Sequence, residues 1–348
     1  MSFKNIVNKM IKAKKFVIAK HFEGEPKPSD LKLTEENLPP ITDGEVLVKA
    51  EYLSVDPYMR PYMLQFPLGF TMIGGQVGKI IESKNSDYPV GKRIFGYFGW
   101  RTHTIFNPRA PEKFKTIDQE PYLLPDIGDL SPSLGLGILG MPGNTAYFGL
   151  IKLCSPKRGE TLVVSGAAGA VGSHVGQIAK NIYGLNVIGI AGSDEKCNWI
   201  VNELGFDSAI NYKTQNVSLE LKKVAPKGVD VYFDNVGGDI SSNVIYQMNP
   251  FGRIAVCGSI SSYNTDHSTL PKCTLLQPAM VFNQLKMEGF VVTRWNDQWQ
   301  EGIKQNLQWI NEGKIKSKET ITKGFENMFH AFYEMMKGQN IGKAIVQV

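Results

Sequence analysis

The sequence predicts an α/β protein of two domains, a doubly wound parallel sheet and a smaller antiparallel β domain. One observation is the length, because 348 residues exceed what a single hydrophobic core usually supports. A second is a change of pattern after Pro142, from short alternating segments to nearly apolar strands separated by amphipathic helices. A third is a glycine-rich run, residues 161–180, that follows a strand and opens a helix.

Residues 1–139 have the pattern of an irregular antiparallel barrel or sandwich. In residues 45–53, EVLVKAEYL, apolar side chains alternate with charged neighbours, which predicts a half-buried strand. Residues 71–83 and 91–106 continue this pattern, with glycines where bends or bulges are expected.

Residues 140–313 predict a parallel sheet with helices on both faces. Strands are expected at residues 161–167, 186–192, 208–212, 229–237, 252–258 and 287–292, and a further helix near 295–311. Residues 314–348 contain a helix with Phe325, Phe329, Phe332 and Met336 on one face, and then a last strand, GKAIVQV. This strand cannot readily extend the parallel sheet without its own crossover helix, so we expect residues 314–348 to return to the first domain.

Composition limits the partners and the compartment. The net charge of +5 is small and spread along the chain, which argues against nucleic-acid binding, and no apolar run reaches the roughly 18 residues of a membrane span. The Lys-rich segment 1–15 lacks the apolar core of a secretory signal, so we expect a short solvated extension, with mitochondrial import as the alternative. Cys154, Cys197, Cys257 and Cys273 are far apart in the sequence, which favours a reducing, cytoplasmic location.

The glycine-rich run predicts a phosphate-binding turn. Gly166, Gly169 and Gly172 are spaced G-x-x-G-x-x-G between a strand and a helix. Missing side chains allow a tight turn, close approach of the backbone to a pyrophosphate, and close packing of the helix on the strand. The NH groups at the start of the helix then face the phosphates. A dinucleotide is therefore predicted, and the alternative is a tight turn without a ligand.

The end of the second strand indicates which dinucleotide. NAD sites usually have Asp or Glu there, on the ribose 2′-hydroxyl. Here the strand ends in Gly192 and Ser193, and Lys196 follows one helical turn later, a set that suits a 2′-phosphate. Asp194 and Glu195 fit the first turn of a helix. NADPH is therefore predicted, and the alternative is that Lys196 is an ordinary solvated lysine.

A catalytic zinc ion is not expected. The β-rich part has no cysteine before Cys154, and His21 and His103 have no partner at ligand spacing. His174 lies in the cofactor helix and is expected to face solvent or the sheet.

Several ordered segments together resemble one known family. They are VDPYMR, GMPGNTAYFGL, AAGAVGSHVGQIAK, GSDEK, YFDNVGG, FGRIAVCGSISSYN and GFENMFHAFYEMMKGQNIGKAIV. From about residue 20 to its end, the chain resembles zinc-free members of the medium-chain dehydrogenase/reductase superfamily, of the prostaglandin reductase type. The resemblance implies a GroES-like barrel beside a Rossmann domain, a homodimer, and NADPH-dependent reduction of C=C bonds conjugated to a ketone or aldehyde. It implies 15-oxoprostaglandin 13-reductase or 2-alkenal reductase activity, with leukotriene B4 12-hydroxydehydrogenase as a related activity.

The resemblance also assigns residues to the site. Those that it implies for the cofactor are Gly169, Ala170, Val171, Gly172, Ser193, Lys196, Tyr212, Asn235, Cys257, Gly258, Ser259, Ile260, Ser261, Ser262, Tyr263, Phe290, Val291, Val292 and Asn340. Among them, the glycine loop would hold the pyrophosphate, Lys196 with Tyr212 the 2′-phosphate, and residues 257–263 the nicotinamide half. Tyr58, Arg60 and Phe282 are expected at the substrate pocket, with loops 61–70 and 262–271 closing on the substrate.

Two features depart from the family pattern. The first 14 or so residues precede its usual start. Phe282 and Asn283 stand where prostaglandin-type members often have Tyr and Gln, which weakens the case for a hydroxylated eicosanoid substrate.

Tyr263 is the expected catalytic residue. It would donate a hydrogen bond to the carbonyl oxygen on which charge collects, or orient the ribose hydroxyl that does so; the alternative is a loop cap. For Tyr58, packing in the barrel is an alternative of nearly equal weight. Two other functions remain open, a quinone reductase on the same scaffold and a non-catalytic NADPH-binding protein.

Overall fold

The computed structural model describes residues 10–109, 119–265 and 274–348, which form two compact units. Of these residues, the first unit contains those up to Ser133 together with Ile321–Tyr333 and Ile345–Val348. The second unit contains Leu134–Thr320 and Glu334–Ala344, within the described ranges. The chain therefore passes from the first unit to the second twice, after Ser133 and after Tyr333, and ends in the first unit.

Three features named above fall wholly or partly outside the described residues. They are Cys273, residues 1–9 of the N-terminal extension, and the loop 262–271 from residue 266 onward. In the part of the chain that is described, no helix has both the length and the apolar character that a membrane crossing requires.

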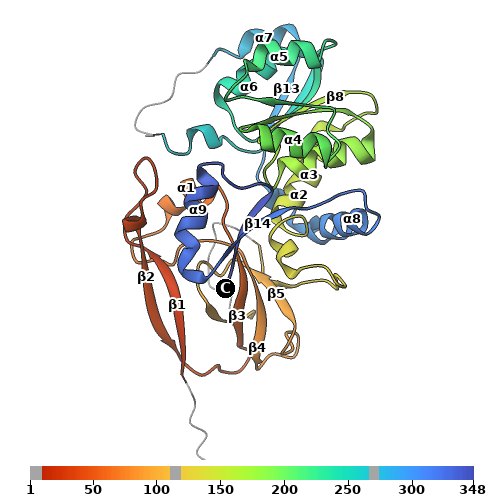
Figure 1. The fold of residues 1–348 in the computed structure, drawn as a ribbon. Helices are drawn as coiled ribbons and strands as arrows, with labels where there is room; N and C mark the ends of the chain where they lie inside the picture. Colours follow the sequence, from red (N-terminus) through yellow and green to blue (C-terminus); the bar gives the residue numbers. More distant parts are fainter. Residues whose placement is uncertain (1–9, 110–118, 266–273) are drawn as a thin grey trace, which may run out of the picture. The chain divides into compact units, whose positions relative to one another are not determined.

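The first unit is antiparallel β-structure, as predicted (Figure 1). Its strands are β1 (Ile11–Ile18), β2 (Leu31–Leu38), β3 (Val46–Ser54), β4 (Gln76–Ser83), β5 (Arg93–Gly96), β6 (His103–Phe106) and β7 (Tyr122–Leu123), joined late in the chain by β14 (Glu319–Lys323) and β15 (Lys343–Gln347). β1 pairs with β2, and the larger sheet has the order β14-β15-β3-β4-β5-β7, with β6 also paired to β3. Two helices belong to this part of the fold, α1 (Met59–Tyr62) and α9 (Met328–Met336).

The expected half-buried strand is β3, which is more buried than simple alternation predicts. Val46 and Val48 pack with Ile80 and Ile94, while Leu47, on the other face, is also buried. The register between β3 and β4 shifts beside Gly78, where a Cβ would lie 2.7 Å from the carbonyl oxygen of Lys49. Glycine therefore permits the close approach of the two strands at this irregularity, as the sequence pattern predicts.

The second unit contains a six-stranded sheet in which all described pairings are parallel (Figure 1). The strands are β8 (Thr161–Ser165), β9 (Asn186–Ala191), β10 (Ser208–Asn211), β11 (Val229–Asp234), β12 (Met248–Val256) and β13 (Lys286–Gly289), in the order β10-β9-β8-β11-β12-β13. The helices are α2 (Met141–Phe148), α3 (Gly172–Gln177), α4 (Asp194–Asn202), α5 (Val217–Val224), α6 (Gly238–Ile245), α7 (Gln277–Phe282) and α8 (Trp299–Asn311). This order is that of a doubly wound dinucleotide-binding sheet, which confirms the predicted fold class.

Close packing of helices on this sheet explains two of its glycines. A Cβ on Gly176 of α3 would overlap the ring of Phe206, and one on Gly189 of β9 would overlap the Cδ1 of Ile200 in α4. The strand β8 is buried along its whole length, with Leu162, Val163 and Val164 inaccessible to solvent. Burial on both faces makes the strand sequence almost purely apolar.

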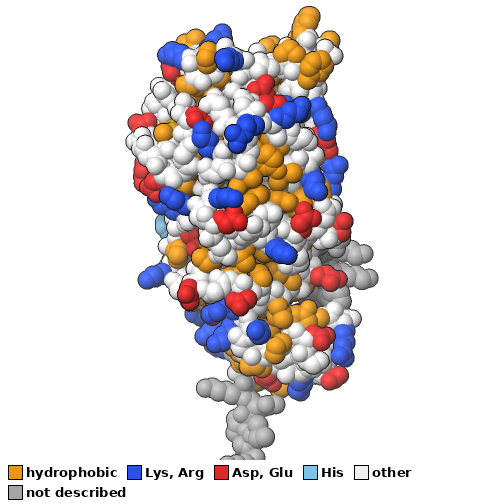
Figure 2. All heavy atoms as spheres, turned by 90° about the vertical axis from the view of Figure 1, so that its right-hand side faces the viewer, with side chains coloured by type: hydrophobic (Ala, Val, Ile, Leu, Met, Phe, Trp, Pro, Cys, Tyr) orange, Lys and Arg blue, Asp and Glu red, His pale blue; other side chains and the backbone are white. Residues whose placement is uncertain are grey.

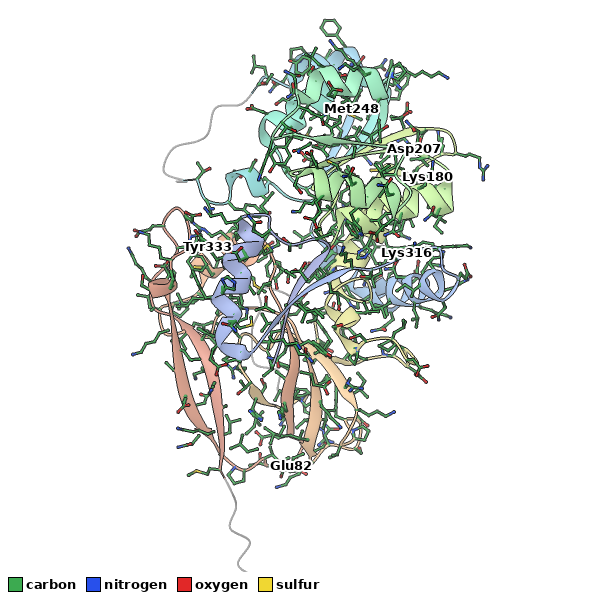
Figure 3. All side chains as sticks on the ribbon, in the orientation of Figure 1. Glu82, Lys180, Asp207, Met248, Lys316 and Tyr333 are labelled. Atoms are coloured by element: carbon green, nitrogen blue, oxygen red, sulfur yellow. The ribbon has the colours of Figure 1, made fainter. Side chains whose placement is uncertain are left out.

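The amino edge of this sheet is held by side-chain bonds of its own. Asp207 accepts a 2.8 Å hydrogen bond from the NH of Val187, at the start of β9, and pairs with Lys180 at 2.5 Å (Figure 3). These contacts lie at the opposite end of the strands from the glycine loop. They therefore anchor the sheet without taking part in the carboxyl edge.

The last strand returns to the first sheet. Ile345, Val346 and Gln347 of β15 pair antiparallel with Ser54, Leu53 and Tyr52 of β3. The residues just before it, Glu334–Ala344, belong to the second unit.

Candidate active site

The strand order brings the carboxyl ends of β8 and β11 side by side. These strands are parallel neighbours, with Val164 opposite Phe233. At their ends the hydroxyl of Ser165 donates a 3.0 Å hydrogen bond to the carboxylate of Asp234. The connections run in opposite directions from this point, and open α/β sheets bind ligands in the crevice that such a reversal creates.

The glycine loop begins directly after β8. Gly166 has φ +61°, a conformation that glycine adopts readily, and its carbonyl oxygen accepts a 3.0 Å hydrogen bond from the NH of Gly169. A Cβ on Gly172 would overlap that same carbonyl oxygen and lie 2.9 Å from the Cα of Ala167. The turn therefore has no room for a side chain at Gly172, where the chain passes Gly166 and Ala167. Such a turn lets the backbone approach a pyrophosphate closely.

The glycine loop is also held by the C-terminal segment of the second unit. Gly342 forms an isolated parallel bridge with Gly169, and its NH donates a 2.8 Å hydrogen bond to the carbonyl oxygen of Ala168. Gly342 has φ +68°, and a Cβ there would overlap the carbonyl oxygen of Lys318. Asn340, a predicted cofactor residue, lies in the same segment and donates a 2.8 Å hydrogen bond to the carbonyl oxygen of Gly342.

His174 lies in α3, directly behind the loop, and is only 2 % exposed. Burial lowers the pKa of its imidazole to about 4, and a hydrogen bond with the backbone of Ala170 partly opposes this effect. The ring is therefore neutral at physiological pH. The solvent-facing alternative considered for His174 is excluded.

The predicted 2′-phosphate residues gather at the start of α4. Ser193 is the N-cap, and its hydroxyl oxygen accepts a 3.2 Å hydrogen bond from the NH of Lys196. The ring of Tyr212 approaches Gly192 so closely that a Cβ there would lie 3.0 Å from it. The carboxylate of Asp194 accepts a 2.7 Å bond from Asn211, so it is engaged within the sheet edge.

The ammonium of Lys196 is held beside a second cation. Its Nζ donates a 2.6 Å hydrogen bond to the carbonyl oxygen of Gly338. Burial lowers the pKa of Lys196, and the positive charge of Lys213 lowers it further. The negative charge of Glu195 partly opposes this lowering, and a phosphate beside Lys196 and Lys213 would stabilise the charged form of both. Lys213 was not predicted, because only the fold brings it near Lys196.

The loop after β12 packs against the end of β11. The NH groups of Cys257 and Gly258 donate 2.8 Å and 3.1 Å hydrogen bonds to the carbonyl oxygen of Asp234. Those of Ile260 and Ser261 bond to the carbonyl oxygens of Asn235 and Val236 at 3.3 Å and 3.1 Å. The predicted nicotinamide residues therefore lie at the same carboxyl edge as the glycine loop.

The thiol of Cys257 lies within this loop. Burial raises its pKa to about 12, with a further contribution from the negative charge of Asp234. It is therefore a protonated thiol at neutral pH and not a nucleophile.

Tyr263 folds back over the start of the same loop. It follows the 3₁₀ turn Ile260–Ser262, and its hydroxyl oxygen accepts a 3.4 Å hydrogen bond from the NH of Ser259. A Cβ on Gly258 would lie 3.1 Å from this hydroxyl. The half-buried phenol therefore stands at the predicted nicotinamide edge, and the contact with Ser259 also fits the loop-cap alternative.

Three predicted cofactor residues follow β13 and differ in what their side chains do. The ring of Phe290 packs edge-on against Phe233 and Trp295, with centroids 6.1 Å and 5.6 Å away. Val292 is buried, whereas Val291 is 55 % exposed. The Phe290 ring thus contributes to the core, and only the backbone groups of this residue are left to bind a ligand.

Two predicted pocket residues lie at the start of α1 in the first unit. Tyr58 packs against Tyr62, with ring centroids 5.6 Å apart, and its buried hydroxyl has no hydrogen-bond partner among the described residues. Burial raises the pKa of Tyr58 well above its usual value, with smaller contributions from Tyr97 and Asp56. An unpartnered hydroxyl favours the pocket role over plain packing, because a buried polar group without a partner is costly.

Arg60, the other predicted pocket residue, is bonded within the first unit. It is 2 % exposed, its guanidinium donates a 2.9 Å hydrogen bond to the carbonyl oxygen of Gly24, and it lies 5.5 Å from the centre of the Phe22 ring. The charge is therefore used inside the first unit, where it secures the segment after β1. Burial lowers the pKa of this guanidinium.

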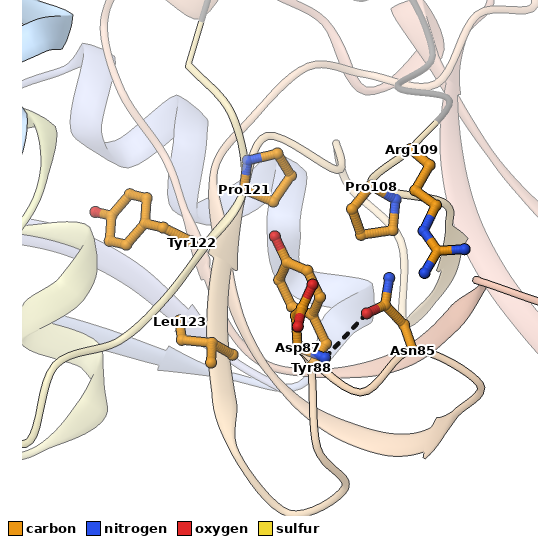
Figure 4. Close-up of a pocket in the computed structure, with 8 residues that line it drawn as sticks. All are labelled: Asn85, Asp87, Tyr88, Pro108, Arg109, Pro121, Tyr122 and Leu123. Carbon is orange, nitrogen blue, oxygen red and sulfur yellow. Dashed lines mark hydrogen bonds between the residues drawn. The ribbon is translucent and has the colours of Figure 1, made fainter.

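Phe282 is the predicted pocket residue of the second unit. It ends α7 and is 83 % exposed, so its ring is not enclosed by the described residues of its own chain. A pocket of about 450 Å³ does occur in the first unit, lined by Asn85, Asp87, Tyr88, Pro108, Arg109, Pro121, Tyr122 and Leu123 (Figure 4). It contains none of the residues predicted for the substrate.

Metal ligands do not assemble in the described parts of the chain. Within residues 10–109, 119–265 and 274–348, no three His, Cys, Asp or Glu side chains come together as a ligand cluster.

Two family models match the chain. One, described as the N-terminal domain of oxidoreductase, matches residues 14–114, and the other, described as zinc-binding dehydrogenase, matches residues 170–311. Prostaglandin reductase 1 of Bos taurus is 48% identical over 340 residues, covering 97% of this chain and 100% of the bovine protein. NADPH-dependent curcumin reductase of Escherichia coli is 36% identical and covers 96% of each chain.

A solved structure gives the same fold. The crystal structure of CurA from Vibrio vulnificus in complex with NADPH matches with a TM-score of 0.87 and 36% identity, covering 96% of this chain and 99% of that one.

Proposed function

Because the chain belongs to the prostaglandin reductase family of the medium-chain dehydrogenase/reductase superfamily, we propose that it is an NADPH-dependent reductase of C=C bonds conjugated to a ketone or an aldehyde. The observation that carries this proposal is the position of Tyr263, whose phenol stands over Gly258 at the carboxyl edge that also holds the glycine loop. A hydrogen-bond donor is thus available beside the expected nicotinamide.

The chain's own residues would bind the cofactor at three points. The loop Gly166–Gly172 receives the pyrophosphate, Lys196 with Lys213 and Ser193 receives the 2′-phosphate, and Cys257–Ser261 lies along the nicotinamide half. When bound, NADPH supplies the hydride that adds to the β-carbon of the substrate.

Tyr263 then acts on the substrate side of the reaction. Charge collects on the carbonyl oxygen as the double bond is reduced, and the phenol donates a hydrogen bond to that oxygen, directly or through a ribose hydroxyl. The hydroxyl oxygen can accept from Ser259 while its proton is donated, since a phenol does both. Water supplies the proton for the α-carbon.

A substrate comparison tests this function. NADPH oxidation is measured with 4-phenyl-3-buten-2-one and 2-nonenal, and in parallel with 9,10-phenanthrenequinone. We expect turnover of the enone and the enal, with saturated carbonyl products identified by mass spectrometry. Turnover of the quinone alone would assign the chain to the quinone reductases. Tight NADPH binding without turnover of any of the three would indicate a non-catalytic binding protein.

We further propose that two copies associate through β13, the last strand of the parallel sheet. Among the described residues β13 pairs only with β12, so its outer edge is open. Four exposed apolar side chains lie in β12, in α7 and just before α7, with exposed fractions of 83 % for Phe282, 73 % for Val281, 70 % for Leu275 and 65 % for Phe251. Figure 2 shows hydrophobic side chains gathered at the top of its view, the end at which Figure 1 has α7.

Charge supports a second copy as the occupant of this edge. Antiparallel pairing about Met287 would set Lys286 opposite the Glu288 side chain of the second copy, and the reverse, so the strand is complementary to itself. Met287→Lys places like charges opposite each other, and we expect a shift from dimer to monomer in sedimentation velocity. Val90→Lys, at an exposed apolar residue of the first unit, is the control. An unchanged dimer in Met287→Lys would rule out this edge.

We propose a cytoplasmic location as well, supported by the free thiols of Cys154, Cys197 and Cys257. Imaging of the tagged chain in cells tests this, and an accumulation in mitochondria would support the import alternative.

A further inference from the structure

Asp234 is a buried carboxylate at the carboxyl edge of the parallel sheet, and it accepts five hydrogen bonds. It ends β11 and is 3 % exposed. Its Oδ1 accepts hydrogen bonds from the hydroxyls of Tyr232 and Ser165 at 2.8 Å and 3.0 Å. The same oxygen accepts from the NH groups of Val236 and Gly237 at 3.0 Å and 2.9 Å.

The second oxygen of Asp234 reaches the next helix. Its Oδ2 accepts a 2.7 Å hydrogen bond from the hydroxyl of Ser241 in α6. All five partners are neutral donors, and among the residues that the structure describes no Lys or Arg forms an ion pair with this carboxylate. A buried carboxylate is tolerated when its oxygens are fully hydrogen-bonded. Hydrogen bonds to a charged acceptor are in turn stronger than bonds between neutral groups.

Asp234 thereby fixes Asn235, one of the predicted cofactor residues. Ser165 donates to Asp234 and accepts a 3.0 Å hydrogen bond from the NH of Asn235. The side-chain amide of Asn235 donates a 2.7 Å bond to the carbonyl oxygen of Ser165. Asn235 is therefore held on β8 at both its backbone and its side chain, next to Gly166, whose Cβ would lie 3.4 Å from that of Asn235.

The turn that Asp234 orders also carries the loop after β12. Five hydrogen bonds link residues 257–261 to the carbonyl oxygens of Asp234, Asn235 and Val236, including a 2.6 Å bond from the hydroxyl of Ser261. Tyr263 follows this loop directly. A shift of the turn therefore moves the loop and Tyr263 together, whereas the residues around Lys196 are attached to other strands.

We infer that Asp234 is a positioning residue, which sets the nicotinamide half of the cofactor site by ordering the turn Asn235–Gly237 and leaves the 2′-phosphate half unaffected. This inference rests on the proposed function for the identity of the cofactor. It assigns Asp234 no contact with the cofactor or the substrate.

Two ligands of different reach test this division. NADPH occupies both halves of the site, whereas 2′,5′-ADP has the adenosine with its 2′- and 5′-phosphates and lacks the nicotinamide half. In Asp234→Asn the side-chain oxygen takes the place of Oδ1 and still accepts from its four donors. The NH₂ group takes the place of Oδ2, and the hydroxyl of Ser241 can rotate to accept a hydrogen bond from it. We expect the Kd for NADPH to rise by about tenfold, since charge-assisted bonds become neutral ones. The Kd for 2′,5′-ADP should stay within about twofold of the wild-type value.

Asp230→Asn is the matched control, because Asp230 lies at the amino end of the same strand. It accepts 2.8 Å hydrogen bonds from the NH of Thr161 and the amide of Asn249. We expect this variant to lose folding stability without changing the Kd for NADPH relative to that for 2′,5′-ADP. Ser165→Ala removes the hydroxyl that joins Asp234 to Asn235, and it should separate the two ligands as Asp234→Asn does; it also serves if Asp234→Asn does not fold.

Calorimetric titration of each variant decides between the outcomes. Equal weakening of NADPH and 2′,5′-ADP, or no change in either, in the folded Asp234 or Ser165 variants would overturn the positioning role. The same separation in Asp230→Asn would overturn it as well. Absence of NADPH binding to the wild-type chain would contradict the proposed function itself, which is a distinct result.

Discussion

The ammonium of Lys196 donates a 2.6 Å hydrogen bond to the carbonyl oxygen of Gly338, which joins the first turn of α4 to the segment that follows α9. The head group of this lysine is thus fixed at the sheet edge and is not a freely solvated cation. Burial and the charge of Lys213 both lower the pKa of Lys196. An anion bound beside the two lysines would therefore stabilise the charged form of Lys196.

Lys196→Ala should weaken NADPH binding much more than NADH binding. Only NADPH carries the 2′-phosphate, and the loss of a charge-assisted hydrogen bond costs about 1.5–3 kcal/mol, or roughly 10- to 100-fold in affinity. The Kd values of both cofactors are measured by fluorescence titration. Lys222→Ala, at an exposed lysine of α5, is the control. Equal losses for NADPH and NADH would remove Lys196 from the phosphate site.

The purified protein should contain no stoichiometric zinc and should keep its activity in chelator. The reason is the scattered arrangement of His, Cys, Asp and Glu, since the described ranges provide no ligand cluster. Elemental analysis of the protein and a reductase assay after dialysis against EDTA check this. One tightly held zinc per chain, whose removal abolishes turnover, would contradict it.

Much of the fold follows from local patterns. The strands of the parallel sheet are covered on both faces, so each is a short apolar run between turn residues, and the expected strand at residues 161–167 is β8, Thr161–Ser165. The start of α9 and its buried face were harder to predict. Phe325 lies in a separate 3₁₀ turn, and the helix begins at Met328, so its fully buried positions include Met328 and Phe332 while Phe329 is half-buried.

The candidate site was predictable only where one segment carries the signal. Three glycines in one run indicate a close backbone approach by their spacing alone. Asp234 and Lys213 give no such signal, because their roles depend on donors or charges from other strands and loops. The burial of Arg60 against Phe22 and the exposure of Phe282 at the end of α7 are tertiary properties, so the sequence gives no signal for either.

His174→Gln should reduce the sensitivity of folding to mild acid. Burial holds the pKa of the folded ring at about 4, against the usual 6.5 of a histidine. Below about pH 6.5 the unfolded chain takes up a proton that the folded chain refuses, so stability falls as the pH drops toward 4. At 1.36 kcal/mol per pKa unit, the difference amounts to roughly 3 kcal/mol.

Urea unfolding at several pH values between 4 and 7 measures this effect. We expect the free energy of unfolding of the wild type to decrease more steeply than that of His174→Gln over this range. His330→Gln, at an exposed histidine of α9, should follow the wild type. Parallel curves for the wild type and His174→Gln would show that His174 does not govern the acid response.

Tyr263→Phe should lower kcat and kcat/KM of enone reduction together. The phenol oxygen lies 3.4 Å from the NH of Ser259, at the edge where the nicotinamide is proposed to lie. A hydrogen bond from this hydroxyl strengthens as charge develops on the carbonyl oxygen, so its loss acts mainly on the transition state. Loss of one such donor typically costs about 10²–10³ in rate, less where water or the ribose hydroxyl replaces it.

Cofactor affinity separates this role from a structural one. The phosphate contacts of NADPH are proposed at Gly166–Gly172 and Lys196, so its Kd should change far less than kcat in Tyr263→Phe. Tyr183→Phe, at the end of the cofactor helix, controls for the removal of a tyrosine hydroxyl elsewhere in the second unit. If Tyr263→Phe kept a near-normal kcat with a raised KM, the phenol would serve only to hold the substrate. A normal kcat and KM with reduced thermal stability would leave the loop cap over Ser259 as its only role, and in either case the catalytic assignment would be withdrawn.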